Sequence, residues 1–212
     1  MDGSRCTSKR QNSRLGRNAG LVVVACVLLV SLAGPTAGVA QQDGPGAWLE
    51  SAPPANWNTP GADIPTAPPP YAEPDPRCGA QERAPESPEE ESVVAAGWRV
   101  FNAAQVGWGM RLVDGLVSYD GMCRPNQFNG FVFADGQFAG TISPTPMDSR
   151  IDGVGRILDM RGPADLFGQF VRYAASDPLC CPSSTFAVDY KVDRSGPAPV
   201  LVFIRSTRTN PG

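Results

Sequence analysis

A two-residue alternation of apolar and polar side chains runs through residues 185–193, and it restricts the fold more than any other feature. One face of this segment collects the apolar side chains Phe186, Val188, Tyr190 and Val192. The opposite face holds Ala187, Asp189, Lys191 and Asp193. A strand with one apolar and one polar face is typical of an antiparallel sheet that packs on one side and meets solvent on the other.

The same pattern continues through the rest of residues 93–212. Asp135-Gly136 lies between two short apolar runs and predicts a tight hairpin that sets Phe133 opposite Phe138. Short turn-separated stretches elsewhere predict further strands over residues 98–103, 110–119, 154–160, 166–173 and 200–207. With 120 residues, this part of the chain is long enough to bury a core of its own.

Proline and glycine oppose a helical fold. The chain of 212 residues contains 22 prolines and 23 glycines, and both residue types weaken helix interiors. Glycines interrupt the two helical candidates, residues 92–104 and 164–169. We therefore predict a mainly β domain, an antiparallel meander or small sandwich stapled by disulfides and carrying one short helix at most, with α+β as the alternative.

The first 40 residues have the three parts of a secretory signal. Residues 1–18 carry five bases against one acid, an apolar run of 16 residues follows over 19–34, and small residues precede Gln41. The apolar run is shorter than the roughly 20 residues that a membrane-spanning helix needs. We expect export to the periplasm, the cell surface or the medium, with cleavage after Ala40.

Two alternatives keep the N-terminus on the membrane. Either the apolar run stays as an anchor, or a lipid is attached at Cys26. A lipid-modified cysteine normally ends the apolar region, whereas residues 27–30 continue it here, so we interpret Cys26 as a small apolar residue of the signal. Membrane contact is expected only through an uncleaved N-terminal segment.

Residues 41–92 form a proline-rich, acidic segment. Its 52 positions contain 12 prolines and 10 acids, with Arg77 and Arg83 as the bases. Such a composition buries too little apolar surface to offset the entropy of ordering, so extended polyproline-like structure is the default. Aromatic residues and Cys78 argue for more order, and we expect residues 47–80 to lie along the surface of the domain, tethered by Cys78.

Four cysteines remain once residues 1–40 are removed: Cys78, Cys123, Cys180 and Cys181. In an exported chain they predict two disulfides. Because the ring closed by two adjacent cysteines is strained, we expect Cys78 and Cys123 each to pair with one member of the adjacent pair. Which pairs with which stays open.

Other roles for the cysteines are weaker. A zinc site would need sequence neighbours at two corners of a tetrahedron. A redox centre lacks a Cys-x-x-Cys motif, although a Cys180–Cys181 disulfide could form one. A thiol nucleophile lacks its base, because the chain contains no histidine. We expect no metal and no cofactor.

The charges of the chain exclude one class of partner and suggest another. A net charge of −3, with 18 bases and 21 acids, gives no electrostatic basis for binding nucleic acid. The domain carries ten arginines and one lysine. Arginine suits bidentate contacts to carboxylates and phosphates, so Arg150 and Arg172 are weak functional candidates, although ordinary surface pairing explains them equally well.

Asp148 and Asp152 are the weak candidates for acid chemistry. A glycosidase holds two carboxyl groups about 5 Å or about 6.5–9.5 Å apart, which closeness in sequence does not establish, and the spacing does not fit an EF-hand calcium loop. The structural interpretation is that they cap a turn and pair with Arg150 or Arg156. Neither a serine-nucleophile motif around Ser183 nor a nucleotide-binding motif is present.

The string DPLCCPS of residues 177–183 is the most unusual in the chain. Together with Arg172-Tyr173, the hairpin string FVFADGQFAGT of residues 131–141 and Ser143-Pro144, it resembles the LppP/LprE lipoprotein family of bacterial envelope proteins over residues 95–208. The resemblance implies export and a surface-associated domain, and it supplies no catalytic residues. The chain departs from the family in lacking a lipid-attachment motif at Cys26.

These features predict an exported, envelope-associated module that binds or supports an unknown partner, whether protein, polysaccharide or lipid, without catalysis of its own. The alternative is an exported hydrolase that uses Asp148 and Asp152 on an envelope polysaccharide. Two convergent acids in a deep cleft would favour the hydrolase. A flat sheet rimmed by arginine and by aromatic residues would favour binding, the aromatic candidates being Trp98, Trp108 and Tyr119, which are more often core residues.

Overall fold

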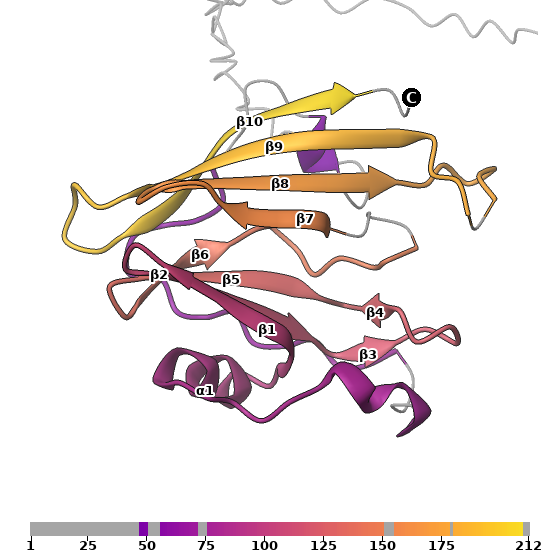
Figure 1. The fold of residues 1–212 in the computed structure, drawn as a ribbon, viewed down its shortest axis with the longest axis horizontal. Helices are drawn as coiled ribbons and strands as arrows, with labels where there is room; N and C mark the ends of the chain where they lie inside the picture. The colour runs from indigo at the N-terminus through magenta and orange to yellow at the C-terminus, as the bar shows by residue number, and fades with distance from the viewer. Residues whose placement is uncertain (1–46, 51–55, 72–75, 151–154, 179, 210–212) are drawn as a thin grey trace, which may run out of the picture. The chain divides into compact units, whose positions relative to one another are not determined.

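The computed structural model (Figure 1) describes residues 47–50, 56–71, 76–150, 155–178 and 180–209. The chain divides after Ala40 into two compact units, and every described residue belongs to the second. The predicted signal, including Cys26, lies outside the described residues. Within the described part of the chain, no helix is both long and apolar enough to cross a membrane.

Two four-stranded antiparallel sheets form the second unit. The first sheet has the order β1-β2-β5-β6, with β1 (Arg99–Gly107), β2 (Met110–Leu116), β5 (Asn129–Ala134) and β6 (Gln137–Thr141). The second has the order β10-β9-β8-β7, with β7 (Gly155–Met160), β8 (Asp165–Arg172), β9 (Ser184–Asp193) and β10 (Val200–Thr209). The predicted mainly β fold is confirmed, in its sandwich form.

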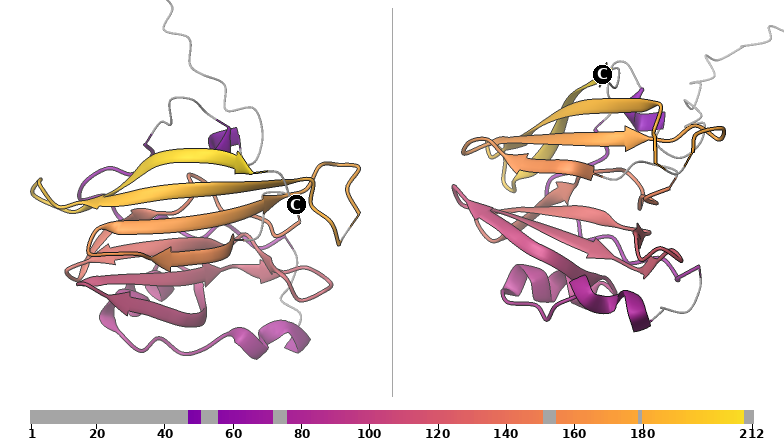
Figure 2. Two further views of the ribbon diagram at one scale, coloured as in Figure 1. Left: turned by 45° about the horizontal axis from the view of Figure 1, so that its top comes forward. Right: turned by 45° about the vertical axis from the view of Figure 1, so that its right-hand side comes forward.

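The remaining elements are short. A two-stranded ribbon joins β3 (Ser118–Tyr119) to β4 (Pro125–Asn126). Two 3₁₀ helices, η1 (Ala47–Leu49) and η2 (Pro76–Gln81), precede the α-helix α1 (Pro88–Ala95). The views in Figure 2 show the two sheets as separate layers, with α1 on the outer side of the first sheet.

The local strand patterns are confirmed. In β9 the alternating apolar side chains are all buried between the sheets: Phe186, Val188, Tyr190 and Val192. Phe133 pairs with Phe138 across the β5–β6 hairpin, as the Asp135-Gly136 turn predicts. The predicted strand 98–103 corresponds to the first part of a longer strand, β1, which begins at Arg99, and the predicted strand 110–119 contains both β2 and β3.

The helix lies earlier than expected. The structure places α1 before most of the candidate segment 92–104, and residues 164–169 lie largely in strand β8. The Ser87 side chain accepts a hydrogen bond from the backbone N–H of Glu90 at 3.3 Å, and a proline and three acids occupy the first turn. These residues cap the free N–H groups and favour the helix dipole. Gly97, with a φ of 95°, follows the helix end.

The first sheet is buried on both of its faces. One apolar cluster lies between the sheets and draws on both of them. A second cluster fills the outer face of the first sheet against α1, and consists of Val93, Trp98, Val100, Val113, Val117, Phe131 and Phe133. This double burial explains why β5 is buried along its whole length, in contrast to the half-exposed β9.

The described parts of the proline-rich segment enter the core as well as covering it. Trp48 and Leu49 are both buried in the cluster between the sheets. The Trp48 ring lies edge-on to three other aromatic rings, with centroids 5.2 Å from Trp57, 5.4 Å from Phe170 and 5.5 Å from Phe203. Residues from this segment are therefore part of the domain interior.

Asn58 joins the two sheets where their edge strands β6 and β10 lie next to each other. Its side-chain amide donates to the carbonyl oxygens of Thr141 and Leu201, each at 3.0 Å, and its carbonyl oxygen accepts from the N–H of Thr141 at 2.8 Å. A Cβ on Gly140 would overlap this side chain. The sandwich is thus closed along the β6–β10 side by a residue far from either strand in sequence.

The disulfide connectivity predicted from the sequence is wrong. The structure joins Cys78 of η2 to Cys123 of the β3–β4 turn, with a Cα–Cα distance of 4.9 Å, and joins Cys180 to Cys181. The β3–β4 turn belongs to the separate two-stranded ribbon, whereas Cys180 and Cys181 lie in the β8–β9 loop of the second sheet (Figure 1). The two disulfides therefore lie in different parts of the fold, and the expectation that adjacent cysteines do not bond each other is wrong here.

Candidate functional site

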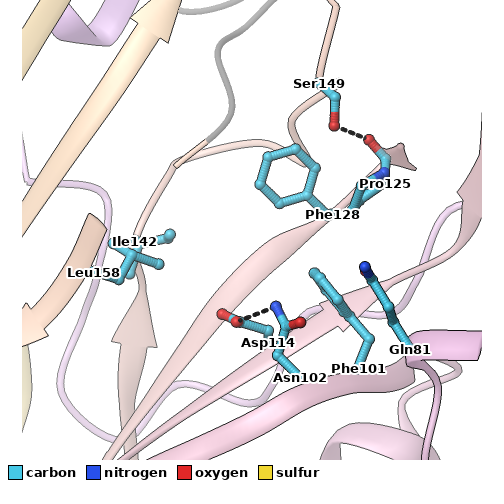
Figure 3. A pocket seen from close by; sticks show the side chains of 9 residues that line it. All are labelled: Gln81, Phe101, Asn102, Asp114, Pro125, Phe128, Ile142, Ser149 and Leu158. Atoms are coloured by element: carbon cyan, nitrogen blue, oxygen red, sulfur yellow. Dashed lines mark hydrogen bonds between the residues drawn. The ribbon is translucent and has the colours of Figure 1, made fainter. Parts of the chain in front are cut away.

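A pocket of about 200 Å³ opens between the sheets on the side opposite the β6–β10 seam. Here the edge strands β1 and β7 approach each other, and the Gln105 side-chain amide donates to the carbonyl oxygen of Leu158 at 2.5 Å. Figure 3 shows the residues that line it: Gln81, Phe101, Asn102, Asp114, Pro125, Phe128, Ile142, Ser149 and Leu158. Five of the nine side chains are apolar, and the residues come from well-separated parts of the chain.

A β-bulge in β1 contributes Asn102 to the lining of the pocket. The pairing of β1 with β2 shifts register between Phe101 and Gln105, and Asn102 within the bulge has a left-handed φ of 56°. Asparagine tolerates this conformation better than most residues. As Figure 3 shows, the bulge turns the Asn102 side chain toward Asp114, and its amide donates to Asp114 Oδ2 at 3.1 Å. The bulge thereby fixes an exposed amide beside the acid that lines the cavity.

Asp114 is the ionisable residue among those that line the pocket. Burial raises the pKa of its carboxyl group to about 6, against an ordinary value of 3.8, because low-dielectric surroundings penalise the charged form. The Asn102 hydrogen bond and the positive charge of Arg83 oppose this rise without cancelling it. At neutral pH the carboxylate is therefore charged but poorly solvated.

The charge of Arg83 is already engaged elsewhere. Its guanidinium donates two hydrogen bonds to Glu90, at 2.7 and 2.9 Å, and its Nε donates to the carbonyl oxygen of Asn102 at 2.5 Å. The Glu90 side chain is 1 % exposed, and the Arg83 hydrogen bonds lower the pKa of its carboxyl group. This buried pair ties α1 to the bulge and leaves Asp114 without a cation of its own among the described residues.

The acids singled out in the sequence lie elsewhere. Asp148 Oδ1 accepts from the backbone N–H of Gln127 at 2.9 Å, and the Tyr71 hydroxyl donates to its Oδ2 at 3.4 Å. Gln127 has a left-handed φ of 50°, so Asp148 stabilises a turn in the way that the structural interpretation expects. Asp152 lies outside the described residues.

The two candidate arginines occupy the far end of the second sheet. Arg150 lies over the ring of Tyr173, 5.2 Å from its centroid, and donates to the carbonyl oxygen of Asp177 at 3.5 Å. Arg172 lines a depression of about 220 Å³ together with Glu50, Tyr173, Ala174, Ser183, Ser184, Phe186 and Arg208. The depression therefore carries both signs of charge, since Glu50 lines it together with Arg172 and Arg208.

The aromatic candidates have three different environments. Trp98 is buried, and its indole N–H donates to the carbonyl oxygen of Pro65 at 2.7 Å. Trp108 is 58 % exposed at the β1–β2 turn. Tyr119 is half-buried beneath the guanidinium of Arg99. The structure does not gather them into one sugar-binding surface.

Sequence reasoning missed Asn102 and Asp114, the hydrogen-bonded pair in the pocket. The available signal was Asp114 itself, a single acid within the otherwise apolar second half of the run MRLVDGL that forms β2. Asn102 gave no signal, because a bulge with a left-handed residue depends on the pairing of two strands. Among the described residues, no group of three or more histidine, cysteine or acidic side chains is placed to hold a metal ion.

The geometry defines a class of protein: an antiparallel β sandwich with a small, mostly apolar, one-acid pocket between its sheets. Residues 116–195 match the family model of the LppP/LprE lipoproteins, which confirms the resemblance found in the sequence. The chain is thus similar to a family of bacterial envelope proteins over β3 to β9. The match contains five pocket residues, Pro125, Phe128, Ile142, Ser149 and Leu158, whereas Asn102 and Asp114 precede it. Comparison with curated proteins and with solved structures found no match.

Proposed function

We propose that this protein is an exported, envelope-associated binding module, without catalysis of its own, that takes a small and mainly apolar molecule into the pocket between its sheets. The apolar end of a larger envelope molecule would bind in the same way. The observation that carries the proposal is the pocket itself, since an apolar concavity with a few placed polar groups is the usual form of a small-molecule site.

The walls of the pocket support an apolar ligand. Phe101, Phe128 and Ile142 belong to the core cluster between the sheets, and Leu158 packs against that cluster. A ligand that contacts these side chains loses water-exposed apolar surface, at about 25 cal/mol per Å². An apolar cavity of about 150 Å³ can bind benzene, so the volume of about 200 Å³ suits a chain of about six carbon atoms.

The hydrolase alternative requires more than this pocket offers. A glycosidase of the common type needs two carboxyl groups on opposite sides of the bond that it cleaves. Asp114 is the sole acid among the residues that line the pocket, and Asp148 is engaged in a turn. Binding is therefore the function that the described residues support best.

The proposal is tested by titrating hexanol into the protein and following the backbone amide NMR shifts. We expect saturable shifts at pocket residues such as Asn102, Ile142 and Leu158. The variant Leu158→Trp places an indole in the cavity and should abolish them. Asp159→Trp is the matched control, because the next residue of β7 points to the opposite face and is exposed.

Two results would overturn the proposed function. One is the absence of saturable shifts in the wild-type protein. The other is that folded Leu158→Trp binds hexanol as tightly as the wild type does. Native mass spectrometry of protein isolated from its own envelope then identifies the natural ligand. Loss of the co-purified mass in Leu158→Trp, but not in Asp159→Trp, would assign that ligand to the pocket.

A further inference from the structure

We propose that the pocket selects ligands that carry a positively charged amine on an apolar body. This inference rests on the proposed binding function and names the chemical class of the ligand. Its basis is the pairing of apolar walls with one carboxylate, Asp114, that has no cationic partner among the residues lining the pocket.

The carboxylate is held in place by its neighbours and is only partly satisfied by them. Asp114 Oδ2 accepts one hydrogen bond, from the Asn102 amide. In Figure 3 the carboxylate lies within the ring of pocket side chains, with Ile142 and Leu158 on one side and Phe101 on the other. A carboxylate can accept about four hydrogen bonds, so a donor that enters the cavity finds acceptor sites on an oxygen atom already fixed in position.

Charge decides which donor fits best. Asn102 is neutral and cannot compensate the negative charge, and the guanidinium of Arg83 is hydrogen-bonded to Glu90. An ammonium group would supply the missing positive charge and a charge-assisted hydrogen bond, which is about twice as strong as a neutral one. A hydroxyl group would supply the hydrogen bond alone, and a carboxylate would be repelled.

The strained backbone points to the same place. Asn102 adopts its left-handed φ of 56° within a bulge of an edge strand, and such outliers cluster at sites where a side chain must be aimed. Here the bulge aims an amide donor at one carboxylate oxygen. The arrangement orients the carboxylate without neutralising it, as recognition of a cation requires.

The experiment compares hexylamine, hexanol and hexanoate, three ligands with one chain and different head groups, by amide NMR titration at neutral pH. We expect hexylamine to bind at least about tenfold more tightly than hexanol, and hexanoate to bind most weakly. In Asp114→Asn, which keeps the shape of the side chain and removes its charge, hexylamine and hexanol should bind within about twofold of each other.

The outcomes separate the two proposals. If none of the three ligands binds in the pocket, the proposed function fails. If hexanol binds as tightly as hexylamine, or if Asp114→Asn leaves their ratio unchanged, the amine selectivity is wrong and the apolar binding function stands. Tightest binding of hexanoate would overturn the selectivity outright, since it would require a positive centre in the cavity.

Discussion

Replacing Asp114 with asparagine is expected to stabilise the fold at neutral pH. The folded protein raises the pKa of this carboxyl group to about 6, from an ordinary value of 3.8, because the charged form is poorly solvated. At about 1.4 kcal/mol per pH unit, this difference corresponds to a penalty of about 3 kcal/mol in the free energy of unfolding. The side chain still meets solvent through the pocket, so about 3 kcal/mol is an upper limit.

The sign of the pH dependence follows from the direction of the pKa change. A carboxyl group whose pKa is raised in the folded state binds its proton more tightly there than in the unfolded chain. Its penalty is therefore absent below pH 3.8, grows between pH 3.8 and about 6, and is fully present above that range. Asparagine does not titrate, so the gain in the free energy of unfolding from Asp114→Asn should grow over the same pH interval.

Urea unfolding of both proteins, followed by tryptophan fluorescence between about pH 4 and about pH 8, measures this difference. Asp159→Asn removes an acid whose side chain is 54 % exposed on β7 and controls for the loss of one negative charge. A gain for Asp114→Asn of the same size at both ends of the pH range would refute the reasoning. So would a loss of stability near pH 8.

Three further predictions concern the rest of the domain. Glu90→Gln should cost about 3 kcal/mol in urea unfolding near neutral pH, because it removes the charge of a 1 % exposed carboxylate that accepts two hydrogen bonds from Arg83. The cost should shrink in acid, since the Arg83 hydrogen bonds lower the pKa of the Glu90 carboxyl, and an unchanged free energy of unfolding would contradict this. Trp48→Ala should lower the free energy of unfolding by about 3–5 kcal/mol, because it opens a cavity among three aromatic rings. A change of less than about 0.5 kcal/mol would instead indicate that Trp48 lies on the surface. Mild reduction followed by alkylation should label Cys180 and Cys181 before Cys78, because the adjacent pair is exposed and Cys78 is 4 % exposed. A disulfide between Cys78 and either adjacent cysteine, found by peptide mapping of the unreduced protein, would disprove the connectivity.

The sequence predicted what depends on neighbouring residues. The alternation in β9 and the Asp135-Gly136 hairpin are local patterns, and the burial of Phe186 and the pairing of Phe133 with Phe138 follow them directly. The start of α1 is also encoded locally, by Ser87 and the acids after it, although the helical candidates in the sequence were residues 92–104 and 164–169.

What the sequence could not predict depends on how distant segments meet. The pairing of Cys78 with Cys123 follows from the position of η2 beside the β3–β4 turn. The pocket forms because a bulge in β1 faces Asp114 of β2, close to where β7 of the other sheet approaches. The turn role of Asp148, by contrast, was one of the two interpretations that the sequence offered, and the Asp148 carboxylate accepts from the N–H of Gln127.

The seam closed by Asn58 has a consequence for how the chain folds. Its bond to Leu201 spans 143 residues, and the bond from the N–H of Phe203 to Asn56 spans 147. An early segment therefore cannot reach its final place until β10, the last strand, has been synthesised. Contacts of such long range slow folding, because chain entropy is lost before they form. The two sheets therefore cannot be joined along this side until β10 is available, although the first sheet contains no strand later than β6.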